Sequence, residues 1–247
     1  NKRNAIARLC EAKFMLSSSD KDFEACRLIL DELAAGFKSE FGSVEGGLRF
    51  TLEEEKTASK SLKPVALDAT TQRALLCLLS GLPHGVLRMS QKIENLVETS
   101  TNMASVEQKK EGEGKAFFEI VCSTRSSLKQ PLEMARAQIR ALGEFCGASV
   151  SQPEAYPGWN PNPQSRILGV TKACYKEMYG TEPESLAIHA GLECGMISDK
   201  CGGVDTVSFG PTITGAHSPD ERVKISTVKP FFELVLKILT TSVALEQ

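Results

Sequence analysis

The chain has 247 residues, of which 41% are hydrophobic and 24% are charged, proportions that are typical of a globular protein. Its formal net charge of −2 at pH 7 gives no support for nucleic acid or a membrane surface as the main partner. No apolar run approaches the roughly 20 residues of a membrane-spanning helix, and the N-terminus lacks the apolar stretch and cleavage site of a signal peptide.

Two strands and two helices are predicted before residue 84. In the first helix, apolar side chains recur at steps of three and four behind the capping candidates Ser19 and Asp20. The second helix is predicted to end at Gly81 and Pro83, neither of which continues a helix well. The strands are assigned from their β-favouring composition. In chain order, the elements are a strand at 4–16, a helix at 17–41, a strand at 46–55 and a helix at 67–83.

The next segment predicts strands followed by a helix. The polar, glycine-bearing stretch 108–115 separates two strand-like runs, which indicates a hairpin. In the second run, Phe118, Ile120 and Cys122 share one face because side chains alternate along a strand. The helix that follows has Pro131 in its first turn. The strands are predicted at 86–90, 96–107 and 116–125, and the apolar face of the helix is formed by Leu132, Ala135, Ile139 and Leu142.

Residues 152–163 interrupt this regular pattern. Four of these twelve residues are proline, and a segment of that composition cannot hold a regular element. We therefore predict a domain boundary here, between an α+β domain with an antiparallel sheet and the end of an α/β domain. The predicted order after the boundary is a helix at 165–179, a strand at 185–190, a glycine-rich loop, a strand at 204–210, a loop with His217 and a helix from Pro230.

Eight cysteines are spread along the chain without a CxxC pair, which argues against a zinc ribbon. Most of them occupy apolar positions, where a free thiol behaves as a small hydrophobic side chain. We therefore expect reduced thiols of a cytosolic protein. A zinc site built from His189, Cys194 and Cys201 would have spacings that match none of the standard structural patterns.

Three side chains are candidate functional groups by position. His217 follows a strand-like run, where α/β folds place ligands and chemistry; the alternative is a loop histidine bonded to a nearby acid. Arg125 lies off the apolar face of its strand, and its planar guanidinium suits a carboxylate. The alternative is a solvated arginine at the end of the strand. Glu193 is the charged group in a glycine-rich loop that permits close backbone approach to a ligand, or it is a surface acid. His84, in a turn, is given no role.

Five motifs occur together and in order: RNAIAR (3–8), LPHGVLRMSQKIENLVETSTNMA (82–104), STRSS (123–127), AIHAGLECG (187–195) and FGPTITGAHSPDERV (209–223). Through them the chain resembles the aminoacylhistidine dipeptidases (Xaa-His dipeptidases), within the superfamily of di-zinc carboxypeptidases and aminoacylases. Such enzymes have an α/β catalytic domain interrupted by a lid domain. The resemblance implies an incomplete lid at 1–151, a linker at 152–163 and the C-terminal segment of the zinc-peptidase catalytic domain at 164–247.

The resemblance also implies roles for four residues. His217 matches the last zinc ligand, and Arg125 matches the lid arginine that binds the terminal carboxylate of the substrate, a bidentate partnership. Asn4 matches a lid asparagine implicated in binding the substrate or the transition state, and Glu193 matches an acid that can meet the free amine. The implied activity is hydrolysis of dipeptides, with a preference for Xaa-His, by an intact cytoplasmic enzyme that holds two zinc ions and forms a homodimer.

The chain departs from the family pattern in what it lacks. The His-x-Asp motif, the bridging aspartate and the glutamate pair with the general base are not found. The run Glu53–Glu55 is not that pair, because it falls in the lid. Zinc sites need three or more protein ligands, so we expect a fragment of a longer protein, inactive alone. The alternatives are a non-catalytic lid or dimerisation module and a related tripeptidase, aminoacylase or deacylase.

Overall fold

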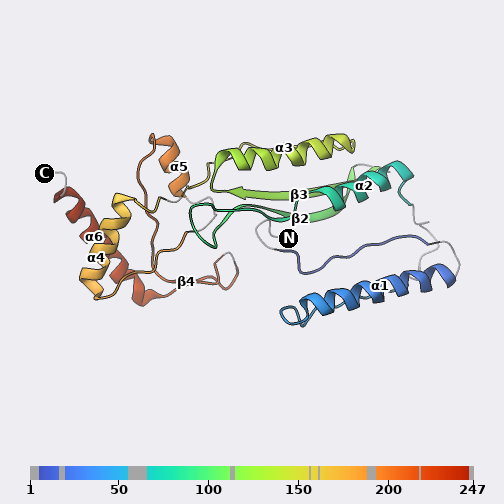
Figure 1. Ribbon diagram of the computed structural model, residues 1–247, viewed down its shortest axis with the longest axis horizontal. Helices are drawn as coiled ribbons and strands as arrows, with labels where there is room; N and C mark the ends of the chain where they lie inside the picture. The colour runs from blue at the N-terminus through green and yellow to red at the C-terminus, as the bar shows by residue number, and fades with distance from the viewer. Residues whose placement is uncertain are drawn as a thin grey trace. The chain divides into compact units, whose positions relative to one another are not determined.

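The computed structural model describes residues 6–16, 20–54, 66–111, 115–155, 157–160, 162–187, 193–216 and 218–244. The chain divides into two compact units, one formed by Arg8–Arg73 and the other by Ala74–Gln247 with the short segment that precedes Arg8. Figure 1 shows the helices and strands of each unit. No helix in the described part of the chain is long and apolar enough to cross a membrane.

The unit Arg8–Arg73 contains one long helix, α1 (Asp20–Phe41), as predicted. The ring of Phe37 lies 6.0 Å from that of Phe41 and 5.6 Å from that of Phe50, so stacking ties the end of the helix to the segment that follows. The strands predicted at 4–16 and 46–55 are wrong for the residues described, which are irregular. A strand requires partners for its backbone N–H and C=O groups, and the described part of this unit offers no second strand.

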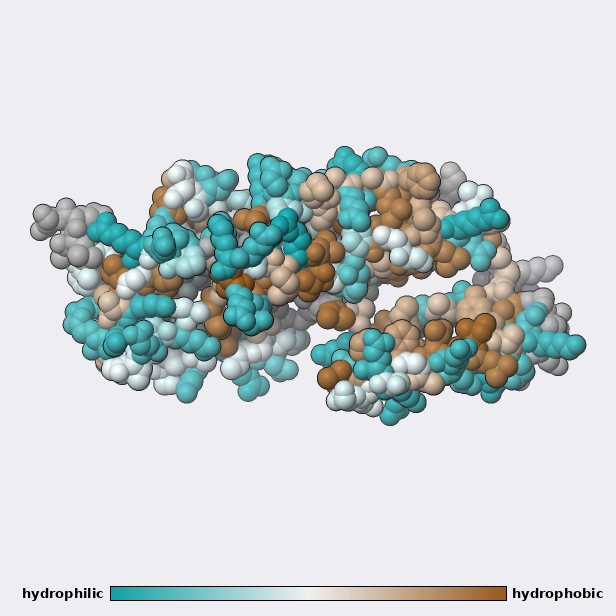
Figure 2. Space-filling view, in the orientation of Figure 1, coloured by the Kyte–Doolittle hydropathy of each residue, from teal (hydrophilic) through white to brown (hydrophobic). Residues whose placement is uncertain are grey.

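The apolar side of α1 is incompletely covered. Leu28, Ile29 and Leu33 remain 69%, 60% and 51% exposed. In Figure 2 apolar side chains accordingly reach the surface of this unit. The helix is therefore specified by its own periodicity and not by burial within the unit.

The second unit contains an antiparallel sheet of order β1-β2-β3, formed by β1 (Gly85–Met89), β2 (Val97–Glu111) and β3 (Lys115–Ser126). The predicted hairpin is confirmed, because β2 pairs with β3 in a register that places Thr101 opposite Thr124. Hydroxyl pairs join the two strands on one face: Thr101 and Thr124 at 2.9 Å, and Thr99 and Ser126 at 2.8 Å. Thr99 is 1% exposed, so this polar pair is buried but satisfied.

The helix after β3 is α3 (Lys129–Phe145), which packs on β3 and β2. Its predicted apolar face is confirmed at Leu132 and Ala135, which are buried. The earlier helix, α2 (Ala69–Gly81), also ends as predicted. Asp68 caps α2, since its Oδ1 accepts from the backbone N–H groups of Thr70 and Thr71 at 3.0 Å each.

The C-terminal region is built on two packed helices, α4 (Arg166–Tyr179) and α6 (Val228–Ala244). Their core consists of Cys174, Leu234 and Ile238. The Ser165 hydroxyl caps α4 at its start, and Gly180 ends it in the left-handed region at φ 73°. Both helix predictions are confirmed, although α6 begins two residues before Pro230.

Three predictions for this region are wrong: the strand at 204–210, the fully irregular glycine-rich loop and the described part of the strand at 185–190. Residues 204–210 are irregular, because no strand in the described part of the chain pairs with them. Part of the expected glycine-rich loop is instead a helix, α5 (Glu193–Lys200), with an acid in its first turn and a base in its last, the arrangement that favours a helix dipole. The loop around position 217 is flanked by a short hairpin of β4 (Ile213–Thr214) and β5 (Arg222–Val223), which precedes the 3-10 turn η1 (Ile225–Thr227). The strand predicted at 185–190 is irregular at 185–187, and its remainder lies outside the described residues.

Candidate functional site

Arg125 lies at the carboxyl end of β3, where it faces Ser100 of β2 in the register. Because side chains alternate along the strand, it points away from the face on which Thr124 and Ser126 are hydrogen-bonded. Its side chain is exposed. In the part of the chain that the structure describes, no carboxylate pairs with this guanidinium, so its five donors are available to an anionic ligand.

The backbone that follows Arg125 is held tightly. Ser126 and Ser127 are each 8% exposed. The N–H of Ser127 donates to the carbonyl of Glu98 at 3.0 Å, and the Ser126 hydroxyl accepts from the N–H of Leu128 at 3.1 Å. These bonds fix the end of the strand and so the direction from which Arg125 projects.

The boundary segment packs directly on this strand end through Gly158. A Cβ atom at this position would lie 2.2 Å from the carbonyl oxygen of Ser126 and 2.9 Å from the carbonyl carbon of Ser127. Only a residue without a side chain allows this approach. The segment 152–163, which the sequence presents simply as a linker, therefore contains a specific contact with the sheet.

A second glycine brings α5 to the same place. A Cβ atom on Gly195 would lie 2.8 Å from the carbonyl oxygen of Pro157 and 3.2 Å from that of Gly158. Glu193 starts α5, two residues before Gly195, and its side chain is exposed. We call the set Ser126, Ser127, Gly158 and Gly195 the glycine junction. Through it, the structure connects two of the predicted site residues, Arg125 and Glu193, by successive backbone contacts.

A hollow of about 560 Å³ lies beside the glycine junction. Trp159 and Asn160 line it from the boundary segment, Ser198 and Asp199 from α5, and Asp205 from the irregular segment after Gly203. The Asp205 carboxylate accepts from the backbone N–H of Ile167 at 3.1 Å. That bond, together with one from the Ser165 side chain, holds the pKa of Asp205 below its usual value. Asp205 therefore anchors this wall of the hollow to the start of α4 as a carboxylate.

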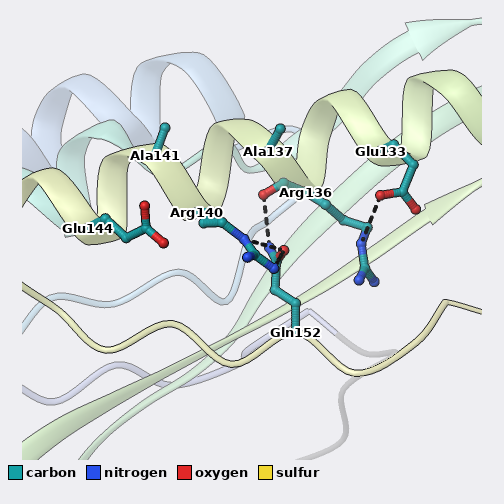
Figure 3. Close-up of a pocket in the computed structure, with 7 residues that line it drawn as sticks. All are labelled: Glu133, Arg136, Ala137, Arg140, Ala141, Glu144 and Gln152. Atoms are coloured by element: carbon teal, nitrogen blue, oxygen red, sulfur yellow. Dashed lines mark hydrogen bonds and ion pairs between the residues drawn. The ribbon is translucent and has the colours of Figure 1, made fainter.

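A second hollow, on α3, has a different character. Figure 3 shows the Arg140 side chain reaching toward Gln152, at the start of the boundary segment, while the Arg136 side chain lies beside Glu133. The Gln152 side-chain oxygen accepts from Arg140 Nε and Nη2 at 3.1 and 2.8 Å, and its Nε2 donates to the carbonyl of Arg136 at 2.8 Å. Arg136 Nη2 also donates to the carbonyl of Pro153 at 2.9 Å. These bonds fasten the boundary segment to α3, while Arg136 Nε is buried without a hydrogen bond to the described residues and lies 3.5 Å from Oε2 of Glu133.

Asn4, His189 and His217 lie outside the described residues, so their predicted roles stay predictions. The flanking turn of His217 is described: Gly215 has φ 65°, and its carbonyl accepts from the Ser218 hydroxyl at 2.6 Å. Among the residues that the structure describes, no group of three histidine, cysteine, aspartate or glutamate side chains could hold a metal.

Sequence reasoning missed the glycine junction and Trp159. The available signal was a large aromatic residue inside a proline- and glycine-rich stretch, Pro157-Gly158-Trp159, where a plain linker has small polar residues. His84, which the sequence left without a role, has a structural one. Its Nδ1 accepts from the backbone N–H of Met103 at 3.0 Å, which joins the turn before β1 to β2.

Comparisons with known proteins bear on the family. The chain is 31% identical over 237 residues to the cytosol non-specific dipeptidase of Escherichia coli (strain K12), a match that spans 96% of this chain and 46% of that protein. It is similar to the crystal structure of aminoacylhistidine dipeptidase from Vibrio alginolyticus, with a TM-score of 0.73 and 31% identity over 90% of this chain and 43% of that one. No family model matches the chain. The chain is therefore a homologue of these dipeptidases, it has their mixed α/β and α+β fold in the region compared, and it spans somewhat less than half of their length.

Proposed function

We propose that this chain is the C-terminal, substrate-binding half of a metal-dependent dipeptidase that hydrolyses dipeptides and prefers Xaa-His. The observation that carries the proposal is the glycine junction, whose close backbone contacts link the strand end that bears Arg125 to the helix start that bears the exposed Glu193. A dipeptide zwitterion has a carboxylate and an ammonium group roughly 7 Å apart when extended. A guanidinium and a carboxylate carried by segments that pack on one another through successive backbone contacts would be complementary to such a molecule.

In this proposal Arg125 binds the terminal carboxylate, and Glu193 meets the free amine. Arginine suits the first role because its planar fork pairs with both carboxylate oxygens. Binding both ends of the substrate would place the scissile bond between them, and such positioning supplies much of the rate of a hydrolase. Asn4 is proposed to contact the substrate or the transition state from the lid.

The proposal assigns only one ligand of the metal site to this chain. Zinc, when bound, would supply an activated water and stabilise the oxyanion. His217 would be one ligand, but a zinc site needs three or more, and the described residues contain no cluster that could provide them. The described part of this chain therefore does not fit a zinc pair by itself. The remaining ligands and the general base are proposed to come from the N-terminal half of the enzyme.

The domain assignment is part of the same proposal: a lid at 1–151, a linker at 152–163 and a catalytic segment at 164–247. The hydrogen bonds of Gln152 with Arg140 and Arg136 of α3 support a linker that starts at the end of the lid. We also propose a homodimer and a cytoplasmic location. The name of the E. coli relative supports the location.

The test is steady-state hydrolysis of Ala-His and of Ala-His amide by the polypeptide that also carries the remaining zinc ligands. Arg125→Ala should raise KM for Ala-His about tenfold, the equivalent of about 1.4 kcal/mol and the low end for a bond to a charged group. It should change KM for the amide little. Lys110→Ala is the control, because it removes a cation from the same sheet. Lys110 lies about 33 Å along β2 from Ser100, which pairs with Arg125, so this variant should change KM for neither substrate.

An unchanged KM in Arg125→Ala, or an equal rise for both substrates, would remove this arginine from the carboxylate site. The present chain should show no hydrolysis by itself with added zinc. Hydrolysis by the chain alone would show that it holds a complete metal centre, and the proposed division of ligands would then be wrong.

A further inference from the structure

The sheet face that bears Arg125 also carries a buried carboxylate. Glu98 lies on the central strand, β2, and its side chain is only 7% exposed. Side chains two residues apart on a strand point to the same face, so Glu98 shares its face with Ser100, the residue that pairs with Arg125 of β3. From the other side, Arg88 of β1 contacts the same carboxylate. Glu98 therefore has an arginine on each of the two neighbouring strands.

Arg88 holds the Glu98 carboxylate in an ion pair. Its Nε lies 3.2 Å from Glu98 Oε1, which is buried and has no hydrogen-bond partner among the described residues. The register of β1 with β2 shifts on both sides of Arg88, an irregularity of the kind that re-aims a side chain. Removing one partner of a buried ion pair is strongly destabilising, because the other charge is left uncompensated. The pairing with Arg88 therefore compensates the buried charge of Glu98.

Arg125 is the second cation within reach of Glu98. The two residues are diagonal neighbours across β2 and β3, which puts their Cα atoms about 7–8 Å apart, a span that long side chains cross. The Arg125 side chain is nevertheless exposed and pairs with no carboxylate in the described part of the chain. Either arginine can neutralise this carboxylate, and the structure shows the pair that Arg88 forms. Because the carboxylate is occupied, the Arg125 guanidinium stays free.

We propose that Arg88 is a positioning residue, which neutralises Glu98 and so keeps the Arg125 guanidinium available to an anionic ligand. In the substrate complex this ligand is the terminal carboxylate of the dipeptide, and that part of the inference rests on the proposed function. The competition between the two arginines for Glu98 does not depend on it. Without the charge of Arg88, the buried carboxylate attracts Arg125. The substrate carboxylate then has to displace Glu98 before it binds.

The first test is modification of the folded chain by phenylglyoxal, a reagent for free guanidinium groups, with the rate at Arg125 measured by peptide mass mapping. In Arg88→Met, which keeps the apolar stem and removes the charge, Glu98 should capture Arg125. The rate at Arg125 should fall about fivefold, the effect of an exposed ion pair at the upper end of its usual strength. Adding Glu98→Gln to Arg88→Met should restore the wild-type rate, because no carboxylate then remains at this position to hold Arg125.

Lys109→Ala is the matched control, because it breaks a different ion pair of the same sheet, the one with Glu107, and should leave the rate at Arg125 unchanged. Arg88→Gln is a second variant, whose amide can still bond to the buried carboxylate but carries no charge, and it should also slow the reaction. Circular dichroism establishes that each variant is folded. An unchanged rate at Arg125 in both Arg88 variants would overturn the proposal. So would a slow reaction that persists when Glu98→Gln is added, because altered packing would then be the cause.

The second test is steady-state hydrolysis by the polypeptide that also carries the remaining zinc ligands. Arg88→Met should raise KM for Ala-His about fivefold, by the same ion-pair competition, and should change KM for Ala-His amide little. In a chain that already carries Arg125→Ala, Arg88→Met should have no further effect on the ratio of the two KM values. Slower modification of Arg125 with an unchanged KM would support the competition for Glu98 and refute Arg125 as the carboxylate anchor, so the two proposals fail separately.

Discussion

Gly158→Ala tests the contact on which the candidate site depends. The added Cβ would lie 2.2 Å from the carbonyl oxygen of Ser126, and Ser127 backbone atoms lie at 2.9 and 3.0 Å. These are backbone atoms fixed by the strand and by the bond from Ser127 N–H to Glu98, so they cannot rotate aside as a side chain could. Relief requires the boundary segment to move by more than 1 Å, and overpacking of this kind costs about 3 kcal/mol, at the upper end of the usual range.

The assay is equilibrium unfolding in urea, with the free energy obtained by linear extrapolation. Gly169→Ala is the control, because Gly169 lies inside α4 with nothing within 4 Å of the added Cβ. It should stabilise the protein by up to about 1 kcal/mol through helix propensity. Gly195→Ala should fall between the two, since its clash at 2.8 Å is partly offset by the same gain in α5. A Gly158→Ala protein as stable as wild type would refute the close packing of the junction.

Two further predictions concern stability. Ile238→Ala empties part of the core between α4 and α6, where Ile238 is 6% exposed, and should cost about 3 kcal/mol in urea unfolding. Leu239→Ala, one residue on and 58% exposed, should cost about 0.5 kcal/mol or less, and equal costs would contradict the assigned helix face. The Thr71 hydroxyl first, and backbone N–H groups next, hold the pKa of Asp68 below its usual value. Its capping contribution to stability is therefore present at neutral pH and is lost as pH falls through the lowered folded-state pKa. The stability difference between wild type and Asp68→Ala should therefore be constant at neutral pH and narrow in acid, and a difference that widened in acid would reverse the sign of the argument.

The candidate site rests on motif reading. The motifs around Arg125 and Glu193 predict substrate-binding roles for both side chains, and these roles stay predictions beside the homology to dipeptidases. The sequence contained no sign that the segments bearing these two residues are linked through Gly158 and Gly195. A glycine needed for close approach looks the same in the sequence as a glycine in an open loop, and only the atoms opposite it make the difference.

Local sequence was sufficient for the helices. Apolar spacing and capping residues predicted α1, α2, α3, α4 and α6, because the hydrogen bonds of a helix close within a few residues of the chain. The β2–β3 hairpin was predictable for a related reason, since its partner strand is adjacent in sequence. The runs at 46–55 and 204–210 have strand composition but no described partner, and they are irregular where the structure describes them. Strand formation and the glycine junction were decided only by the tertiary structure, because each depends on backbone brought together from distant parts of the chain.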